Sequence, residues 1–137
     1  MTYTVVAFVK RKEGITPTEF RSYYSTVHIP LMQSLVGSAF PLTHTRNFVT
    51  RNAVDGSPKA SSQQEFAPVL YMGQPSDVNY DCITVMVWED KAAFDRFFQV
   101  FSTKEVAERV AEDNKNFLDS SLQLIYELDE PSVTKRA

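Results

Sequence analysis

Residues 80–89 have the sequence YDCITVMVWE, which is the clearest β-strand pattern in this chain. Side chains alternate between the two faces of a strand. One face therefore carries Ile83, Val85 and Val87, and the other carries Cys82, Thr84, Met86 and Trp88. Because both sets are almost entirely apolar, the pattern predicts a central strand that is covered on two sides.

The segments before this strand predict a strand, a helix and a second strand. Residues 3–9 are rich in β-branched and aromatic types, which favours a strand. Thr16-Pro17-Thr18-Glu19 has the form of a capping box with proline at the first helical position, and apolar residues follow at helical spacing. Pro30 is expected to break or kink this helix near His28. Residues 42–51 alternate and predict the second strand.

The segments after the second strand differ in how clearly they predict structure. Residues 52–65 are rich in Ser, Gly and Gln without a period, which indicates a loop excursion that serves as a mobile lid or rim. Residues 66–71 are a short apolar run of undecided type. Asp90 caps a helix, residues 102–105 form a second capping box that begins another helix, and residues 121–128 predict the last strand.

The order of these elements predicts the fold class. Strand, helix, strand, strand, helices, strand is the βαββαβ pattern of a ferredoxin-like α+β domain. We expect one such domain over residues 1–130 and a loose tail over residues 131–137. Its helices cover one sheet face, and leaving the large apolar side chains of the other face in water costs roughly 1.5–3 kcal/mol each. We therefore expect a homodimer in which two sheets face each other.

Length and composition exclude several classes of function. The chain has 137 residues, a formal net charge of −3 and one cysteine, Cys82. This length fits one domain, and an acidic balance gives no electrostatic reason to bind nucleic acid. No apolar run approaches the roughly 20 residues that span a bilayer. The N-terminus turns basic after its apolar run, the reverse of a secretory signal, so we expect a cytoplasmic protein.

Two motifs resemble a known family. The first helix leads into Tyr23-Tyr24-Ser25-Thr26-Val27-His28-Ile29-Pro30-Leu31, and the segment before the last strand reads Asp113-x-x-x-Phe117-x-Asp119. Together with the strand order, these motifs resemble the EthD-domain family of dimeric α+β barrels over almost the whole chain. Its relatives include muconolactone-type isomerases and fungal aromatic-polyketide tailoring enzymes, among them decarboxylases and anthrone oxygenases. The resemblance implies a ligand cavity inside each sheet, no metal and often no cofactor, and it does not fix the reaction.

His28 and Tyr24 are the first catalytic candidates. Imidazole titrates near neutrality, and the expected helix break would free the ring of His28 from the packed stripe. Tyr24 lies one turn earlier and could hydrogen-bond the ring or reach the same ligand. In the isomerases that the chain resembles, a histidine at this motif position acts on the substrate. The alternative is a capping or buried structural histidine.

His44 and Arg46 lie on one face of the second strand. If that face points into the cavity, Arg46 could clamp a carboxylate or phenolate, and His44 would be a second catalytic acid–base group. If the face points outward, both are solvated surface residues. Periodicity alone does not say which face is inside.

The remaining candidates for substrate contacts are acidic or aromatic. Asp113 could orient a histidine, although a solvated helix charge is the commoner case. Tyr80 lies at the start of the central strand and could be a polar residue at the mouth of the cavity. Trp88 and Phe117 are expected in the core and are candidates for the cavity wall. No metal site is expected, because the two histidines lack close ligand spacing and no cysteine cluster adds to them.

The sequence is compatible with three functions. The first is a cofactor-independent enzyme that acts on an aromatic or polyketide-like molecule by general acid–base chemistry, giving decarboxylation, cyclisation or isomerisation. The second is a cofactor-free monooxygenase of the anthrone type, in which the substrate supplies the electrons. The third is a non-catalytic protein that binds small molecules.

Overall fold

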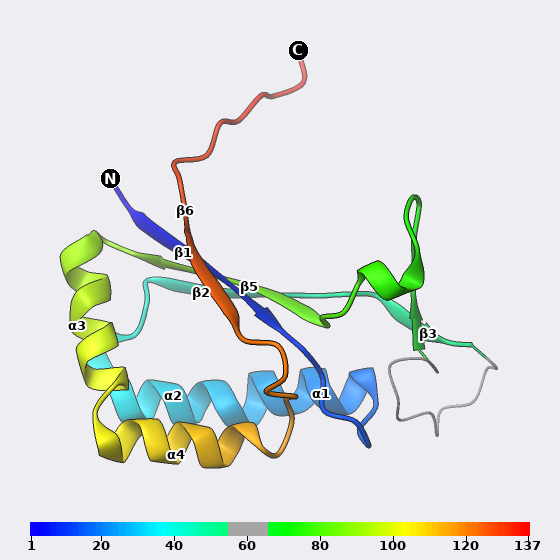
Figure 1. The fold of residues 1–137 in the computed structure, drawn as a ribbon. Helices are drawn as coiled ribbons and strands as arrows, with labels where there is room; N and C mark the ends of the chain where they lie inside the picture. Colours follow the sequence, from blue (N-terminus) through cyan, green and yellow to red (C-terminus); the bar gives the residue numbers. More distant parts are fainter. Residues whose placement is uncertain (55–65) are drawn as a thin grey trace.

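The structure is a computed structural model that describes residues 1–54 and 66–137 (Figure 1). Its elements, in chain order, are β1 (Tyr3–Val9), α1 (Pro17–Tyr23), the π-helical η1 (Tyr24–His28), α2 (Ile29–Val36), the 3-10 turn η2 (Gly37–Ala39), β2 (Thr43–Phe48), β3 (Arg51–Ala53), β4 (Phe66–Pro68), the 3-10 turn η4 (Pro75–Asp77), β5 (Cys82–Trp88), α3 (Lys91–Phe101), α4 (Lys104–Asn114) and β6 (Leu124–Leu128).

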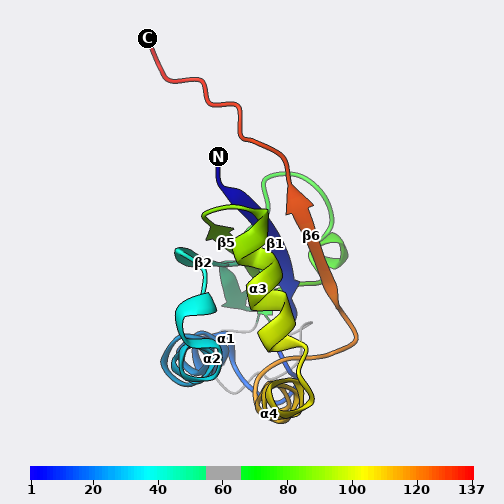
Figure 2. The same ribbon diagram turned by 90° about the vertical axis from the view of Figure 1, so that its left-hand side faces the viewer.

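Four strands form one antiparallel sheet in the order β2-β5-β1-β6. In Figures 1 and 2, α1, α2 and α4 lie together on one side of this sheet. The predicted central strand is β5, which pairs with β2 on one side and β1 on the other. This arrangement confirms the predicted α+β class and the βαββαβ order.

The register of the strands shows which side chains share a face. Thr84 of β5 lies opposite Ala7 of β1 and Arg46 of β2. Thr84 and Ala7 are buried, and the Thr84 hydroxyl bonds to a helix residue, Tyr24, so this is the helix-covered face. His44 is two residues before Arg46 on the same strand and shares that face. The face that sequence periodicity left open is thus the inner one.

The opposite face of the sheet points away from the helices, and we name it the open face. Its β6 side chains are large and apolar, and Leu124, Tyr126 and Leu128 are 45%, 46% and 39% exposed. The other members of the open face come from the inner strands and include Val6, Phe8, Ile83, Val85 and Val87.

The first helical stretch is continuous from α1 to α2. The predicted capping box is present, because the Thr16 hydroxyl accepts from the backbone of Glu19 and the Glu19 carboxylate accepts from the backbone of Thr16. Of the predicted break or kink at Pro30, the break does not occur, because the helical stretch continues through residue 30. The turn before it widens into η1 instead, where the Ile29 N–H donates to the Tyr24 carbonyl. Pro30 has no N–H to donate and its ring crowds the preceding turn, and π-helical turns of this kind occur as bulges inside α-helices.

The second pair of helices begins as the sequence indicated, with one difference. The Asp90 carboxylate caps α3 by accepting from the Ala93 N–H at 2.8 Å. A helix does begin after residue 103, but the predicted second capping box is not formed. Thr103 is the N-cap of α4, and its hydroxyl donates back to the Val100 carbonyl.

The predicted excursion over residues 52–65 begins in a strand. β3 pairs with β4, so the undecided run at residues 66–71 begins with a strand too. Arg51 fastens this hairpin to the body, because its side chain forms a 2.7 Å ion pair with Asp81 and donates to the carbonyls of Phe66, Val78 and Tyr80. The predicted lid lies mostly outside the described residues.

The chain ends in an extended segment, residues 129–137, that leads away from the body on the side opposite the helices (Figures 1 and 2). Within the two described ranges, no helix is both long and apolar enough to cross a membrane.

Candidate functional site

His28 and Asp113 form a buried pair that joins two helical elements. His28 ends η1 and Asp113 lies near the end of α4, and the two residues are only 8% and 5% exposed. The His28 Nδ1 atom is 2.8 Å from Asp113 Oδ2. A carboxylate can only accept, so the ring proton lies on Nδ1 and the Nε2 atom carries the lone pair of a base. Asp113 is therefore not the solvated helix charge that its position suggested.

The second oxygen of Asp113 is also engaged. The Tyr23 hydroxyl donates to Asp113 Oδ1 at 2.7 Å, and the Asn116 amide donates to the Tyr23 oxygen at 3.0 Å. Burial acts to raise the pKa of the Asp113 carboxyl, but hydrogen bonds from Tyr23 and His28 outweigh it and lower that pKa. Asp113 is consequently an anion at neutral pH.

The surroundings of His28 keep its ring neutral. Phe117 packs against it with ring centroids 4.7 Å apart, and the Tyr24 ring lies at 5.7 Å. Burial lowers the pKa of His28, and the attraction of Asp113 offsets only part of this effect. A neutral imidazole with a fixed tautomer can act as a general base.

His44 has the opposite tautomer. The Arg46 guanidinium donates from Nη1 to His44 Nδ1 at 2.9 Å, and Arg46 also donates from Nε to the Ser25 hydroxyl at 3.2 Å. Arg46 has no acceptor, so His44 Nδ1 carries the lone pair and Nε2 carries the proton. Burial, followed by repulsion from Arg46, lowers the pKa of His44 to about 4. His44 is therefore a neutral hydrogen-bond donor through Nε2.

Tyr24 connects the two histidines. Its ring lies 5.7 Å from that of His28 and 6.0 Å from that of His44. Its hydroxyl shares a 2.8 Å hydrogen bond with Thr84. Burial raises the pKa of Tyr24, so the phenol stays protonated. The structure thus gathers all three predicted catalytic residues in one cluster.

The predicted substrate-binding residues divide into two groups. Arg46, Asp113 and Phe117 contact one of the two histidines. Trp88 lies in the hydrophobic core instead, where its indole N–H donates to the Ala39 carbonyl. Tyr80 packs edge-on against Phe8 of the open face, away from the cluster.

Three further residues of the cluster were not predicted from the sequence. Tyr23 and Ser25 lie inside the quoted motif, but nothing in the motif says which members point at His28 or Arg46. Thr84 carries a usable signal, since it is a polar residue on a buried strand face that is otherwise apolar. Such a residue needs a hydrogen-bond partner, and here the partner is Tyr24.

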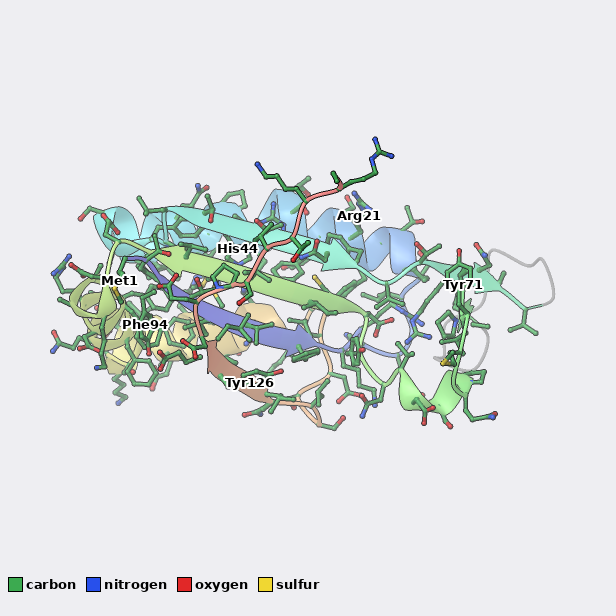
Figure 3. The ribbon with its side chains drawn as sticks, turned by 90° about the horizontal axis from the view of Figure 1, so that it is seen from above. Met1, Arg21, His44, Tyr71, Phe94 and Tyr126 are labelled. Atoms are coloured by element: carbon green, nitrogen blue, oxygen red, sulfur yellow. The ribbon has the colours of Figure 1, made fainter. Side chains whose placement is uncertain are left out.

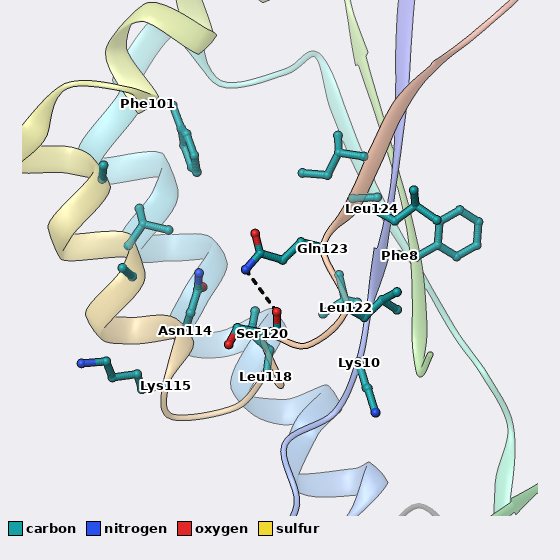
Figure 4. A pocket seen from close by; sticks show the side chains of 16 residues that line it. Phe8, Lys10, Phe101, Asn114, Lys115, Leu118, Ser120, Leu122, Gln123 and Leu124 are labelled. Carbon is teal, nitrogen blue, oxygen red and sulfur yellow. Dashed lines mark hydrogen bonds between the residues drawn. The ribbon is translucent and has the colours of Figure 1, made fainter. Parts of the chain in front are cut away.

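A cavity of about 560 Å³ lies between α4 and the edge formed by β1 and β6 (Figure 4). Its walls are mainly apolar, and its polar members are Lys10, Asn114, Lys115, Ser120 and Gln123. None of the five residues Tyr24, His28, His44, Arg46 and Asp113 lines it. Figure 3 shows His44 and Tyr126 on opposite edges of the sheet, so the histidine cluster and this cavity belong to different sides of the helix-covered face.

The fold and the two histidines, each bonded to a charged partner, together define a ferredoxin-like α+β protein with an internal acid–base cluster. A family model described as "EthD domain" matches residues 12–121, which is most of the chain. The protein belongs to the EthD-domain family. No curated protein matches this sequence.

Solved structures share the fold at low sequence identity. An EthD-family protein from Bacillus halodurans is 17% identical, with a TM-score of 0.52 and coverage of 96% of this chain and 100% of that one. HapK from Hahella chejuensis is 12% identical, with a TM-score of 0.53 and coverage of 100% and 99%. SnoaB from Streptomyces nogalater, a cofactor-independent oxygenase, is 11% identical, with a TM-score of 0.50 and coverage of 98% of each chain.

Proposed function

We propose that this protein is a cofactor-independent enzyme that moves protons on an aromatic or polyketide-like small molecule. The observation that carries the proposal is the buried 2.8 Å pair of His28 and Asp113, which leaves Nε2 of a neutral imidazole as a base. One solved structure with the same fold is described as a cofactor-independent oxygenase, which supports catalysis without a bound cofactor.

In the proposed reaction, the two histidines have complementary roles. His28 Nε2 removes a proton from an activated C–H or phenolic O–H group, and the Asp113 carboxylate stabilises the imidazolium that forms. His44 donates its Nε2 proton as a hydrogen bond to the substrate oxygen on which negative charge develops. Returning the proton to a different atom gives isomerisation or cyclisation, and returning it to carbon after loss of CO₂ gives decarboxylation.

Arg46 supplies the positive charge of the site. Because one of its nitrogens is used by His44 and another by Ser25, its guanidinium is held in place at the half-buried edge of β2. A fixed guanidinium suits a carboxylate or phenolate of the substrate. Arg46→Ala should weaken substrate binding more than it slows the chemical step.

The same base also supports the alternative of an anthrone-type monooxygenase. Deprotonation by His28 would give a substrate carbanion that reduces O₂, so that a ring methylene becomes a carbonyl. One oxygen atom enters the product and the other leaves as water. This alternative is favoured by the description of SnoaB as an oxygenase.

The cavity of Figure 4 favours the third candidate, which is binding without catalysis. Its size lies within the range of roughly 300–1,000 Å³ typical of ligand sites, and its walls are mostly apolar. A ligand held there would contact none of the histidine cluster.

The test is turnover of a panel of aromatic polyketide acids and anthrones, followed by mass spectrometry with an oxygen electrode in parallel. Product without oxygen uptake supports the lead proposal, and stoichiometric uptake supports the monooxygenase. His28→Gln should lower turnover by about 100- to 10,000-fold. Asp113→Asn should also lower turnover, because the imidazolium loses its anionic partner. Its control is Asp95→Asn, on the exposed face of α3, which should keep wild-type turnover. Wild-type turnover by His28→Gln, or binding of the panel without any conversion, contradicts an acid–base role.

A further inference from the structure

Tyr23 donates a hydrogen bond to the Asp113 oxygen that His28 does not contact. The carboxylate accepts from Tyr23 at Oδ1, 2.7 Å away, and from His28 at Oδ2, 2.8 Å away. Each oxygen therefore has its own donor, and rotating the carboxylate breaks both hydrogen bonds.

The Tyr23 hydroxyl is itself fixed in position. Its ring stacks on Phe117 with centroids 5.3 Å apart and planes 27° apart, and the same Phe117 ring packs against His28. At its outer end, the hydroxyl oxygen accepts from the exposed Asn116 amide at 3.0 Å. Tyr23 is also the last residue of α1, directly before the π-helical segment that ends in His28. Both hydrogen bonds to the carboxylate therefore come from one continuous helical stretch.

We propose that Tyr23 is a positioning residue of this site, whose hydroxyl orients the Asp113 carboxylate so that the His28 proton stays on Nδ1. The catalytic consequence rests on the proposed function of His28 as a base. The structural consequence, which is the tautomer of His28, holds whether or not the protein is an enzyme.

The groups that act on this pair come from several elements. Asp113 is faced by Tyr23, His28 and Asn116, and the charge of Arg109 acts on Tyr23. His28 and His44 also repel each other when both are protonated. Of these groups, Tyr23 donates the 2.7 Å hydrogen bond to Asp113 Oδ1, and its loss leaves the histidine itself unchanged.

The test is long-range ¹H–¹⁵N spectroscopy of the histidine rings, together with ¹³C titration of the aspartate carboxyls. In the wild type, His28 should be almost wholly in the Nδ1–H form. In Tyr23→Phe, which keeps the stacked ring, the Nε2–H form should become detectable, and the pKa of Asp113 should rise because one hydrogen bond to the charged carboxylate is lost. With a turned-over substrate, kcat should fall about tenfold with little change in KM.

Two controls and a second test variant complete the experiment. Tyr3→Phe removes a surface hydroxyl that donates to Glu127 and should leave His28 unchanged. Tyr23→Phe should have no further effect on His28 in an Asp113→Asn background, since the carboxylate is then gone. If Tyr23→Phe is poorly folded, Asn116→Ala serves as the second test variant. It removes the exposed amide that donates to the Tyr23 oxygen and should shift the tautomer in the same direction by a smaller amount.

An unchanged His28 tautomer in both Tyr23→Phe and Asn116→Ala overturns the proposal, as does an equal change in Tyr3→Phe. A changed tautomer in a protein that converts no substrate leaves Tyr23 as a positioning residue and counts against the proposed function alone. The two failures are therefore distinguishable.

Discussion

Each histidine of this chain has one ring nitrogen assigned by a charged neighbour. An anion, Asp113, accepts from His28, whereas a cation, Arg46, donates to His44. The Nε2 atom is consequently a base in His28 and a donor in His44. Two residues of one type thus acquire different chemistry from their partners.

The low pKa of His44 predicts how stability depends on pH. A histidine that titrates at about 4 in the folded state and near 6.5 in the unfolded state binds fewer protons when folded. Its contribution is complete above pH 6.5 and is lost as the pH falls toward 4. Allowing for its partial exposure, we expect a loss of about 2 kcal/mol, and the lowered pKa of His28 acts in the same direction.

Urea unfolding at pH 7.5 and pH 4.5 measures this loss. His44→Gln keeps a polar side chain and removes the titrating group, so its stability should change less between the two pH values. An equal change in His44→Gln and wild type would show that other groups cause the effect.

At the scale of elements, η1 brings Tyr24 and His28 into the same cluster. Pro30 has no N–H and its ring crowds the preceding turn, which an ordinary α-helix does not tolerate. The turn before Pro30 is the wide, π-helical η1. Beside it, the Thr26 hydroxyl donates to the Ser22 carbonyl at 2.6 Å. π-helical turns inside helices are frequent at functional sites, and here the wide turn ends at His28.

Local pattern predicted the elements but not the partners of the site residues. The apolar faces of β5 and the capping box at Thr16 depend on neighbours in the sequence, so they were recognisable. The contact between His28 and Asp113 spans 85 positions in the chain and depends on how α4 packs on η1. For the same reason, the inner orientation of His44 became clear only from the register of β2 against β5.

The hairpin of β3 and β4 gives a prediction about stability. Arg51 has a side chain that is 2% exposed, and its contacts join Asp81, β4 and the segment before β5. Arg51→Met fills similar space but leaves a buried carboxylate and three carbonyls without these donors. We expect a loss of about 3–5 kcal/mol in the free energy of unfolding. Arg21→Met, an exposed arginine over the Phe48 ring, is the control and should cost below about 1 kcal/mol. Similar losses in the two variants would contradict this role of Arg51.

At the scale of the whole molecule, the helices cover one face of the sheet (Figures 1 and 2). The open face presents exposed Leu124, Tyr126 and Leu128, and residues 129–137 extend from the same side (Figures 1 and 2). A contiguous apolar surface of this kind marks an interaction site. A second copy of the chain offers a surface of the same shape and chemistry, and its own extended segment would add contacts beyond the sheet.

We therefore predict a homodimer formed through the open faces, with the mass in light scattering at micromolar concentration equal to twice the 15.6 kDa of one chain. Tyr126→Glu places a charge in the middle of the proposed interface and should shift the mass toward one chain, because an unpaired charge is costly to bury. Tyr71→Glu is the matched control, since Tyr71 is 96% exposed on the segment after β4 and lies away from the sheet (Figure 3). Truncation after Leu128 should weaken the dimer without unfolding the protein. A monomer mass for the wild type, or equal effects of the two tyrosine substitutions, would contradict this assembly and require another cover for the open face.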